Sequence, residues 1–205
     1  MGDPSGPRQD DWRESLSAAN DTLNRLAAAV TGSLREERTP LIVANTCAAS
    51  LATLPVAATA RPGATLLWVD AHGDFNTPGT TASGYLGGMV LAAACGLWDS
   101  GHGAGLDPRQ VILVGARDID DAEGRLLAEH GVRIVSPVDA VPEALLPMIG
   151  ISEVWIHVDW DVLEPGFVPA AYAVPNGLPP QQLKALLAAI AAERIAAISG
   201  GLAAV

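Results

Sequence analysis

Two short segments of the sequence concentrate side chains that can bind metal ions. Asp70, His72 and Asp74 recur at every second residue of the first segment, and Asp159 and Asp161 do the same in the second. This spacing projects side chains to one side of an extended chain. Because each segment directly follows an apolar run, the carboxylates and the imidazole should meet at one edge of a buried sheet. Carboxylates crowded in such surroundings either become protonated or bind cations.

The donor set suggests which ions these would be. Oxygen-rich ligation with one or two imidazoles suits Mn²⁺ best among the common divalent ions. Since several of the carboxylates can bridge, we expect two Mn²⁺ ions, a kind of site that activates water for hydrolysis. A single Asp after a strand more often caps a helix or occupies a turn. Two acidic clusters, each behind an apolar run, make that explanation the weaker one.

The elements that must position these clusters alternate along the chain. Apolar runs typical of strands buried on both faces alternate with stretches of helical periodicity. This pattern predicts the α/β class: a single domain of three αβα layers around a mostly parallel sheet, which binds ligands beyond the carboxyl ends of its strands. The expected strands are 41–44, 65–69, 111–114, 133–135 and 154–158, and the expected helices are 12–34, 50–60, 86–94, 122–130, 140–148 and 180–192. The domain is expected over 12–205, after a disordered segment 1–11 rich in Gly, Pro and charge.

The amino-acid composition indicates which classes of partner and which cellular compartment to expect. The formal net charge of −11 argues against nucleic acid or an anionic membrane as a partner. The two cysteines, Cys47 and Cys95, form no disulfide framework, which favours a reducing compartment. The polar N-terminus does not resemble a signal peptide, and no apolar run reaches the length of a membrane span. We therefore expect a cytoplasmic protein.

The two acidic segments resemble the two signatures of the arginase/agmatinase ureohydrolases. Residues 70–78 read DAHGDFNTP, similar to the family's D-A-H-x-D-x-N-x-P, and residues 157–165 read HVDWDVLEP, similar to S-x-D-x-D-x-x-D-P. Their order and separation also fit. The resemblance implies an arginase-like fold, hydrolysis of a guanidino C–N bond in a small amino acid, and the homo-oligomers that are common in the family.

The resemblance also implies a role for each matching metal ligand. Asp70 and Asp159 would bridge the two ions, while His72 and Asp161 would complete one of them. Asp74 would bind the other ion and would be the catalytic residue that passes a proton to the departing amine.

Three further positions match residues that bind the amino-acid part of the substrate in arginases. Asn76 and Ser83 would bind the α-carboxylate, and Asp120, in a segment similar to the family's R-D-x-D, would face the α-amino group. Each of these residues taken alone would more often be a solvated loop side chain. Together they favour an amino-acid guanidine over agmatine.

One departure from the family pattern points to a particular branch. Cys47 occupies the place of the family's first metal-binding His. We expect a thiolate ligand there, with a buried packing cysteine as the alternative; a thiolate would shift the metal preference and make the site sensitive to oxidation. The substitution and its surroundings resemble the enzymes that hydrolyse Nω-hydroxy-L-arginine to ornithine and hydroxyurea in D-cycloserine biosynthesis.

Three other departures concern catalysis. Gly87 stands where arginases carry a proton-shuttling His, and His157 replaces the Ser that begins the second signature. We expect His157 to be a core histidine, with a supporting role behind the ligands as the alternative. After Ile198 the sequence continues with Ser-Gly-Gly where the family carries a Glu that binds the guanidinium. The family fold is therefore expected to be incomplete at both ends.

The sequence thus predicts a binuclear metal-dependent amidinohydrolase that acts on linear amidines, with Nω-hydroxy-L-arginine as the expected substrate. The alternative is a catalytically impaired or truncated ureohydrolase-like protein with no turnover. A metal store or sensor that performs no chemistry ranks last, because Asn76, Ser83 and Asp120 would then have no reason to occupy substrate-facing positions.

Overall fold

The computed structural model describes the backbone of residues 10–201 and the side chains of residues 10–192. Most of the segment expected to be disordered, residues 1–9, lies outside this range. Asp11 is the N-cap of the first helix and accepts a hydrogen bond from the Arg13 amide at 2.8 Å. The Asp10 amide donates to the Ser83 carbonyl at 3.0 Å, so the chain before the helix is held against a distant loop.

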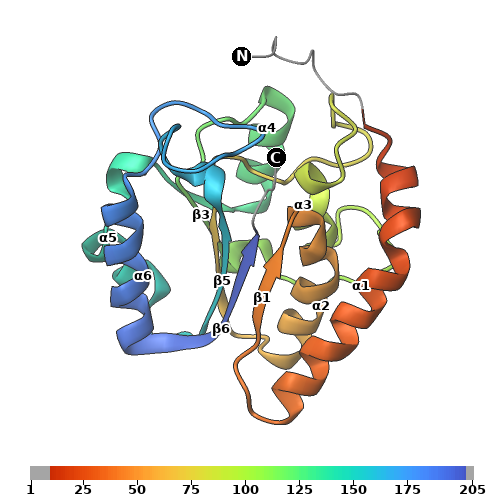
Figure 1. The fold of residues 1–205 in the computed structure, drawn as a ribbon, viewed down its shortest axis with the longest axis horizontal. Helices are drawn as coiled ribbons and strands as arrows, with labels where there is room; N and C mark the ends of the chain where they lie inside the picture. Colours follow the sequence, from red (N-terminus) through yellow and green to blue (C-terminus); the bar gives the residue numbers. More distant parts are fainter. Residues whose placement is uncertain (1–9, 202–205) are drawn as a thin grey trace.

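A single sheet of six parallel strands forms the centre of the molecule (Figure 1). Its order is β1-β6-β5-β2-β3-β4, which places the strands behind the two acidic segments side by side. The predicted α/β fold with a mostly parallel sheet is confirmed. The strands are β1 Leu41–Ala44, β2 Thr65–Val69, β3 Val111–Val114, β4 Arg133–Val135, β5 Val154–Asp159 and β6 Ile195–Gly201.

Strand β6 was not among the expected strands, although it lies inside the sheet between β1 and β5. Ile198 pairs with Leu41 on one side and with Ile156 on the other. The segment is rich in Ala and Gly, which have low strand propensity. Pairing with two neighbours, which no local pattern reveals, accounts for its conformation.

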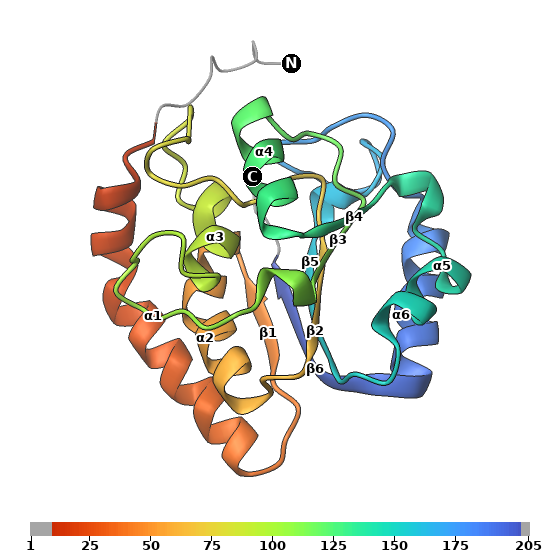
Figure 2. The ribbon, with the colours of Figure 1, turned by 180° about the vertical axis from the view of Figure 1, so that it is seen from behind.

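Two layers of helices cover the sheet, one on each face (Figure 2). Alternate residues of β2 enter different cores: Leu66 and Trp68 pack with helices α1, α2 and α3, whereas Leu67 and Val69 pack with α5 and α6. This two-residue alternation is what a strand buried on both faces requires. The helices are α1 Trp12–Arg35, α2 Ser50–Ala60, α3 Val90–Ala94, α4 Asp121–His130, α5 Pro142–Ile149 and α6 Pro180–Arg194.

Two of the expected helices begin later than the sequence pattern suggested. The segment 86–94 divides into a 3₁₀ turn, Gly87–Met89, and the short helix α3, since consecutive glycines disfavour a regular helix. Helix α5 begins at Pro142 rather than at residue 140, because proline fits the first turn of a helix. Among the described residues, no helix is both long and apolar enough to cross a bilayer.

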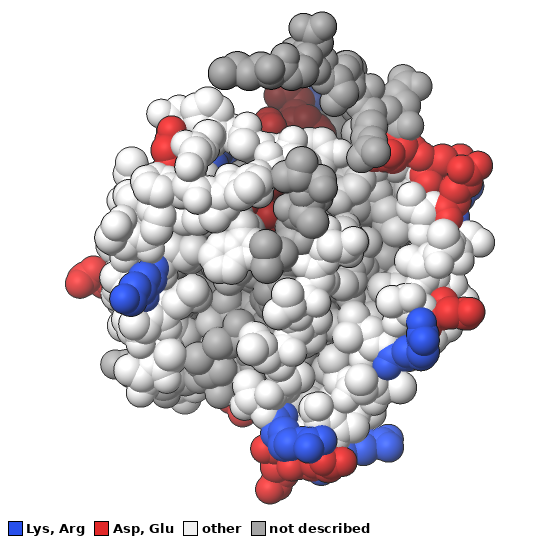
Figure 3. All heavy atoms as spheres, in the orientation of Figure 1, with Lys and Arg blue, Asp and Glu red and all other residues white. Residues whose placement is uncertain are grey.

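The two edge strands depart from the expected burial on both faces. In β1, Leu41 is 73% exposed and Val43 is 71% exposed, and in β4 Ile134 is 47% exposed. Ile42 packs partly against the core of α1 and α2, so Leu41 and Val43 project to the opposite face, where the layer of α5 and α6 does not reach them. Figure 3 shows one side of the molecule, on which charged side chains gather mainly near the margin.

Candidate metal centre

The carboxyl ends of β1, β2 and β5 bring the predicted metal ligands together. Val69 pairs with Val158 across the β2–β5 ladder, so Asp70 and Asp159 follow at the same edge of the sheet. Cys47 begins a 3₁₀ turn, Cys47–Ala49, that follows β1. Parallel strands all end at this edge, and for that reason residues more than a hundred positions apart can share one site.

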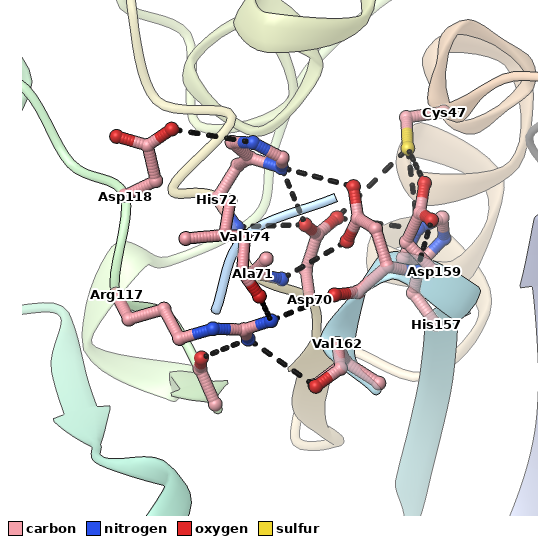
Figure 4. A network of polar contacts seen from close by, with 12 residues as sticks. Cys47, Asp70, Ala71, His72, Arg117, Asp118, His157, Asp159, Val162 and Val174 are labelled. Atoms are coloured by element: carbon pink, nitrogen blue, oxygen red, sulfur yellow. Dashed lines mark hydrogen bonds and ion pairs between the residues drawn. The ribbon is translucent and has the colours of Figure 1, made fainter. Parts of the chain in front are cut away.

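One set of donors lies entirely in the interior and contains Cys47 (Figure 4). The Cys47 Sγ atom lies 3.0 Å from Asp159 Oδ2 and 3.9 Å from Asp70 Oδ2. His157 Nε2 lies 3.6 Å from the same sulfur. The donor atoms of these four residues all lie within 4.8 Å of one another, a spacing that one ion could span.

A second set of donors lies closer to the surface and contains His72. His72 Nδ1 lies 3.3 Å from Asp70 Oδ1 and 3.1 Å from Asp161 Oδ2. The Ala71 amide donates to Asp161 Oδ1 at 3.2 Å, which fixes that carboxylate. The His72 side chain is 25% exposed. Asp70 belongs to both sets, the arrangement that a bridging carboxylate would have.

Asp74 lies outside both sets of closely spaced donors but faces the same buried region. Its backbone has a φ of 48°, a left-handed conformation that is costly for a residue other than glycine. Its Oδ2 atom is buried and has no hydrogen-bond partner among the described residues. An unsatisfied buried carboxylate oxygen costs free energy unless a ligand completes it.

The electrostatics show how crowded these carboxylates are. Burial, together with Asp161 and Asp159 and against the His72 hydrogen bond, raises the pKa of Asp70 to about 7. Burial and the neighbouring Asp70 raise the pKa of Asp74 well above its usual value, and burial and Asp161 raise the pKa of Asp159. All three carboxyl groups would ionise more readily beside a cation.

The imidazoles and the thiol complete this picture. Burial alone would lower the pKa of His72, but the hydrogen bonds to Asp161 and Asp70 raise it to about 11. Burial lowers the pKa of His157 to about 3, so this ring is neutral. Burial and then Asp74 raise the pKa of Cys47. The oxygen, nitrogen and sulfur donors, together with the unsatisfied Asp74 oxygen, therefore fit divalent cations.

Of the predicted substrate residues, the structure brings Asn76 and Asp120 together. Asn76 Nδ2 donates to Asp120 Oδ2 at 3.0 Å, and Asn76 Oδ1 is buried without a partner among the described residues. Asp120 also caps α4 by accepting from the Ala122 and Glu123 amides. Ser83 has other partners: its Oγ accepts from the Tyr85 amide, and its carbonyl accepts from Asp10.

Arg117 links the loop that follows β3 to the loop that follows β5 by hydrogen bonds (Figure 4). Its guanidinium donates to the carbonyls of Asp161 at 2.9 Å, Val174 at 2.7 Å and Val162 at 3.2 Å. The R-D-x-D segment is recognisable in the sequence, but no role was predicted for Arg117, because backbone carbonyl acceptors leave no sequence signal. The residue holds the backbone that carries Asp161.

Glu123 is a buried carboxylate that contacts the backbone of the first acidic segment. Its Oε1 accepts from the Phe75 amide at 2.7 Å, and a Cβ at Gly73 would lie 2.7 Å from its carboxyl carbon. Burial raises the pKa of Glu123 to about 7. Its position three residues after the Asp120 cap is the signal that could have indicated a structural role.

Tyr85 occupies the space beside Gly87. A Cβ at Gly87 would lie 2.3 Å from Tyr85 Cε1, so a side chain at this position would require the ring to move. The Tyr85 hydroxyl forms a 3.0 Å hydrogen bond with Thr46 Oγ1, next to Cys47. The position at which arginases carry a His is thus closed by an aromatic ring.

His157 has contacts that fit each of the two roles that the sequence left open. It is buried and stacked on Trp68, with ring centroids 3.6 Å apart and an interplanar angle of 7°, as expected of a core residue. Its two ring nitrogens nevertheless face polar groups, Cys47 Sγ and Ser50 Oγ. Two residues before Asp159 on β5, it shares the face of that carboxylate, and this two-residue spacing was the available signal.

Comparison with known proteins places the chain in a family. The arginase family model matches residues 8–199. The chain is 52% identical to the Nω-hydroxy-L-arginine amidinohydrolase of Streptomyces lavendulae, over 95% of this chain and 71% of that protein. It is 32% identical to the arginase of Bacillus caldovelox over 58% of this chain, a match that spans 42% of that enzyme.

Solved structures agree with these sequence matches. The crystal structure of arginase from Bacillus cereus superimposes with a TM-score of 0.85 at 27% identity, covering 91% of this chain and 70% of that one. The fold, the two acidic signatures and the sequence identity lead to the same conclusion. The chain belongs to the arginase family of metal-dependent hydrolases.

Proposed function

We propose that this chain hydrolyses the guanidino C–N bond of Nω-hydroxy-L-arginine and releases ornithine and hydroxyurea. One observation carries the proposal: a cysteine sulfur lies among the buried carboxylates, 3.0 Å from Asp159, in a chain that is 52% identical to an enzyme named for this substrate. The closed position beside Gly87 supports it further, because the proton-shuttling His of arginases has no counterpart there.

The cofactor we propose is a pair of Mn²⁺ ions. Cys47 and Asp74 would hold one ion, His72 and Asp161 the other, and Asp70 with Asp159 would bridge them. The oxygen-rich donors suit Mn²⁺, while the sulfur makes one position softer than the other. When bound, two such ions lower the pKa of water and stabilise the charge that develops during hydrolysis.

The residues of the chain then divide the remaining work. Asn76, Ser83 and Asp120 would bind the α-carboxylate and α-amino groups, which fixes the guanidinium against the acidic segments. Water adds to the guanidinium carbon, and the bond from that carbon to the δ-nitrogen breaks. The Asp74 carboxylate, which is buried and has no hydrogen-bond partner at Oδ2 among the described residues, would take a proton from water and give it to the departing amine.

The partners and the compartment follow from the same residues. We infer a small guanidino amino acid as partner, with neither nucleic acid nor membrane, since the net charge is −11. A reducing cytoplasm suits the free thiols Cys47 and Cys95. The exposed Leu41 and Val43 are compatible with a homo-oligomer. Release of hydroxyurea would suit a role in antibiotic biosynthesis.

The test is product release from three guanidines by the purified chain with added Mn²⁺. Ornithine and hydroxyurea should form from Nω-hydroxy-L-arginine, while arginine and agmatine should react at least about 100-fold more slowly, a difference of roughly 3 kcal/mol in activation free energy. Asp159→Asn should be inactive, and Asp107→Asn, at an exposed surface ion pair, should retain wild-type turnover. Folded, metal-loaded protein that acts on none of the three would instead be a non-catalytic member of the family.

A further inference from the structure

We propose that Ser50 and His157 form a hydrogen-bonded relay behind Cys47 that positions its sulfur as a metal ligand. In this relay Ser50 donates to His157, and His157 donates to the sulfur. The inference rests on the proposed function only in that Cys47 belongs to the metal site. It assigns His157 as a positioning residue that acts through Cys47 rather than on the substrate.

His157 is held by contacts on its ring face and at both ring nitrogens. The ring is 2% exposed and stacks on Trp68 at 3.6 Å. Ser50 Oγ lies 3.3 Å from Nδ1, and Cys47 Sγ lies 3.6 Å from Nε2. A ring with a stacking partner on its face and a polar partner at each nitrogen has one orientation, which Figure 4 shows beside Cys47 and Asp159.

The hydrogen bonds around His157 run in one direction, from Ser50 through the ring to the sulfur. Nε2 faces the sulfur and, at 4.0 Å, Asp70 Oδ2, both of which are acceptors when they bind a cation. A neutral imidazole carries one N–H, so it is best placed on Nε2, and Nδ1 is then the acceptor. The Ser50 hydroxyl can donate to Nδ1, and this donation fixes the tautomer.

The ring acts through the sulfur and is not itself a ligand. The sulfur and Nε2 are about equally far from Asp70 Oδ2, at 3.9 Å and 4.0 Å, but the sulfur also lies 3.0 Å from Asp159 Oδ2. Stacking on the buried Trp68 and the Ser50 contact at Nδ1 hold the ring in its place behind the sulfur. Outer partners of this kind orient a metal ligand and increase its affinity.

The experiment replaces the ions with Co²⁺ and measures affinity and the sulfur-to-cobalt charge-transfer absorption, both without substrate. His157→Phe keeps a ring to stack on Trp68 but removes both hydrogen bonds. We expect it to weaken Co²⁺ binding by about 10- to 100-fold and to diminish or shift the absorption band. His157→Gln, which keeps a side-chain N–H donor, should recover most of both signals. Ser50→Ala should produce a smaller change in the same direction.

Two controls define the signal. Cys47→Ala should lack the sulfur band, and Cys95→Ala, the other free cysteine, should keep it. The circular dichroism of the metal-free variants checks folding. If His157→Phe does not fold, His157→Gln and Ser50→Ala carry the test: a sulfur band and Co²⁺ affinity unaltered by Ser50→Ala would then contradict the relay.

Three results would overturn the proposal. The first is a wild-type protein without the sulfur band, since Cys47 would then bind no metal. The second is a folded His157→Phe variant with an unchanged band and an affinity within twofold of wild type. The third is loss of one ion from His157→Phe with the band intact and no recovery in His157→Gln, which would make His157 itself a ligand. Wild-type protein with the band but without turnover would contradict the proposed function and leave the relay standing.

Discussion

The two halves of the candidate metal centre share Asp70 but differ in environment. The half around Cys47 is entirely buried and uses a thiol backed by a neutral imidazole, His157. The half around His72 reaches the surface, and there hydrogen bonds to two carboxylates overcome the effect of burial and raise the pKa of the imidazole to about 11. Burial thus favours the uncharged forms of Cys47 and His157 in one half, whereas the carboxylates in the other half favour the charged form of His72.

The difference bears on how each half takes up a cation. Metal ligands bind in their deprotonated forms, so uptake of an ion by each candidate site would displace a proton from Cys47 in the buried half and from His72 in the other. A protonated His72 itself partly neutralises Asp70 and Asp161 until an ion replaces its proton. Four predictions test this comparison, beginning with the largest expected effect.

Asp70→Asn removes the residue that the two halves share. We expect the chain to lose high-affinity binding of both ions and turnover to fall by about 1000-fold or more, equivalent to about 4 kcal/mol of activation free energy. Metal content after gel filtration and steady-state kinetics measure the effect. Asp107→Asn, in an exposed ion pair with Arg109, is the matched control. Two ions retained by Asp70→Asn would show that Asp70 does not join the halves.

Cys47→Ala and His72→Ala each remove a donor from one half. Each variant should keep one tightly bound ion, and turnover should fall by about 100-fold. The two variants should differ in metal preference. Cys47→Ala should bind Zn²⁺, the softer ion, less favourably relative to Mn²⁺ than wild type does, whereas His72→Ala should keep the wild-type preference for the softer ion. Competition between Mn²⁺ and Zn²⁺, followed by calorimetry, distinguishes them. Identical behaviour of the two variants would contradict the distinction between the halves.

Glu123→Gln tests the buried carboxylate on the His72 side. Burial raises its pKa to about 7 in the folded protein, above the usual 4.5, so the protonated form stabilises the fold. This contribution is complete below about pH 4.5 and is lost as the pH rises through 7, an effect on the order of 3 kcal/mol. The variant should therefore lose less stability than wild type between pH 5 and 8 in urea titrations. Glu129→Gln, exposed on the same helix, should follow wild type.

Arg117→Met should have the smallest effect, and it should be confined to the His72 half. Removing the guanidinium leaves the carbonyls of Asp161, Val174 and Val162 without a charged donor, at a cost of about 1.5–3 kcal/mol in unfolding free energy. Backbone amide hydrogen exchange should become faster in the loop after β5 but should remain unchanged at the Cys47 amide. Arg109→Met, at an exposed position, is the control. Equal loosening of both halves would contradict this assignment.

Much of the fold followed from local pattern, and its exceptions have physical causes. Helix α2 begins and ends at the predicted residues, Ser50 and Ala60, and β2 and β3 match their apolar runs. Strand β6 was missed because its Ala- and Gly-rich sequence has little strand preference of its own. The exposure of Leu41 and Val43 depends on how far the opposite helical layer extends, which no property of β1 encodes.

The candidate site divides in a similar way. Asp70, His72, Asp159 and Asp161 were predictable, since a carboxylate or imidazole directly after a buried strand must lie at its carboxyl end. The Asn76–Asp120 hydrogen bond fits the roles implied by the family resemblance, whereas Ser83 bonds to Tyr85 and Asp10. The roles of all these residues remain predictions for the experiments above.

The sequence by itself determined the class of chemistry, because the types and spacing of the acidic residues are local properties of two short segments. Only the tertiary structure decided which donors face one another. Cys47 and Ser50 lie more than a hundred residues before His157 in the sequence, and the strand order β1-β6-β5 brings them together. Burial, which sets the charge of each donor, is also a property of the packed molecule and not of any one segment.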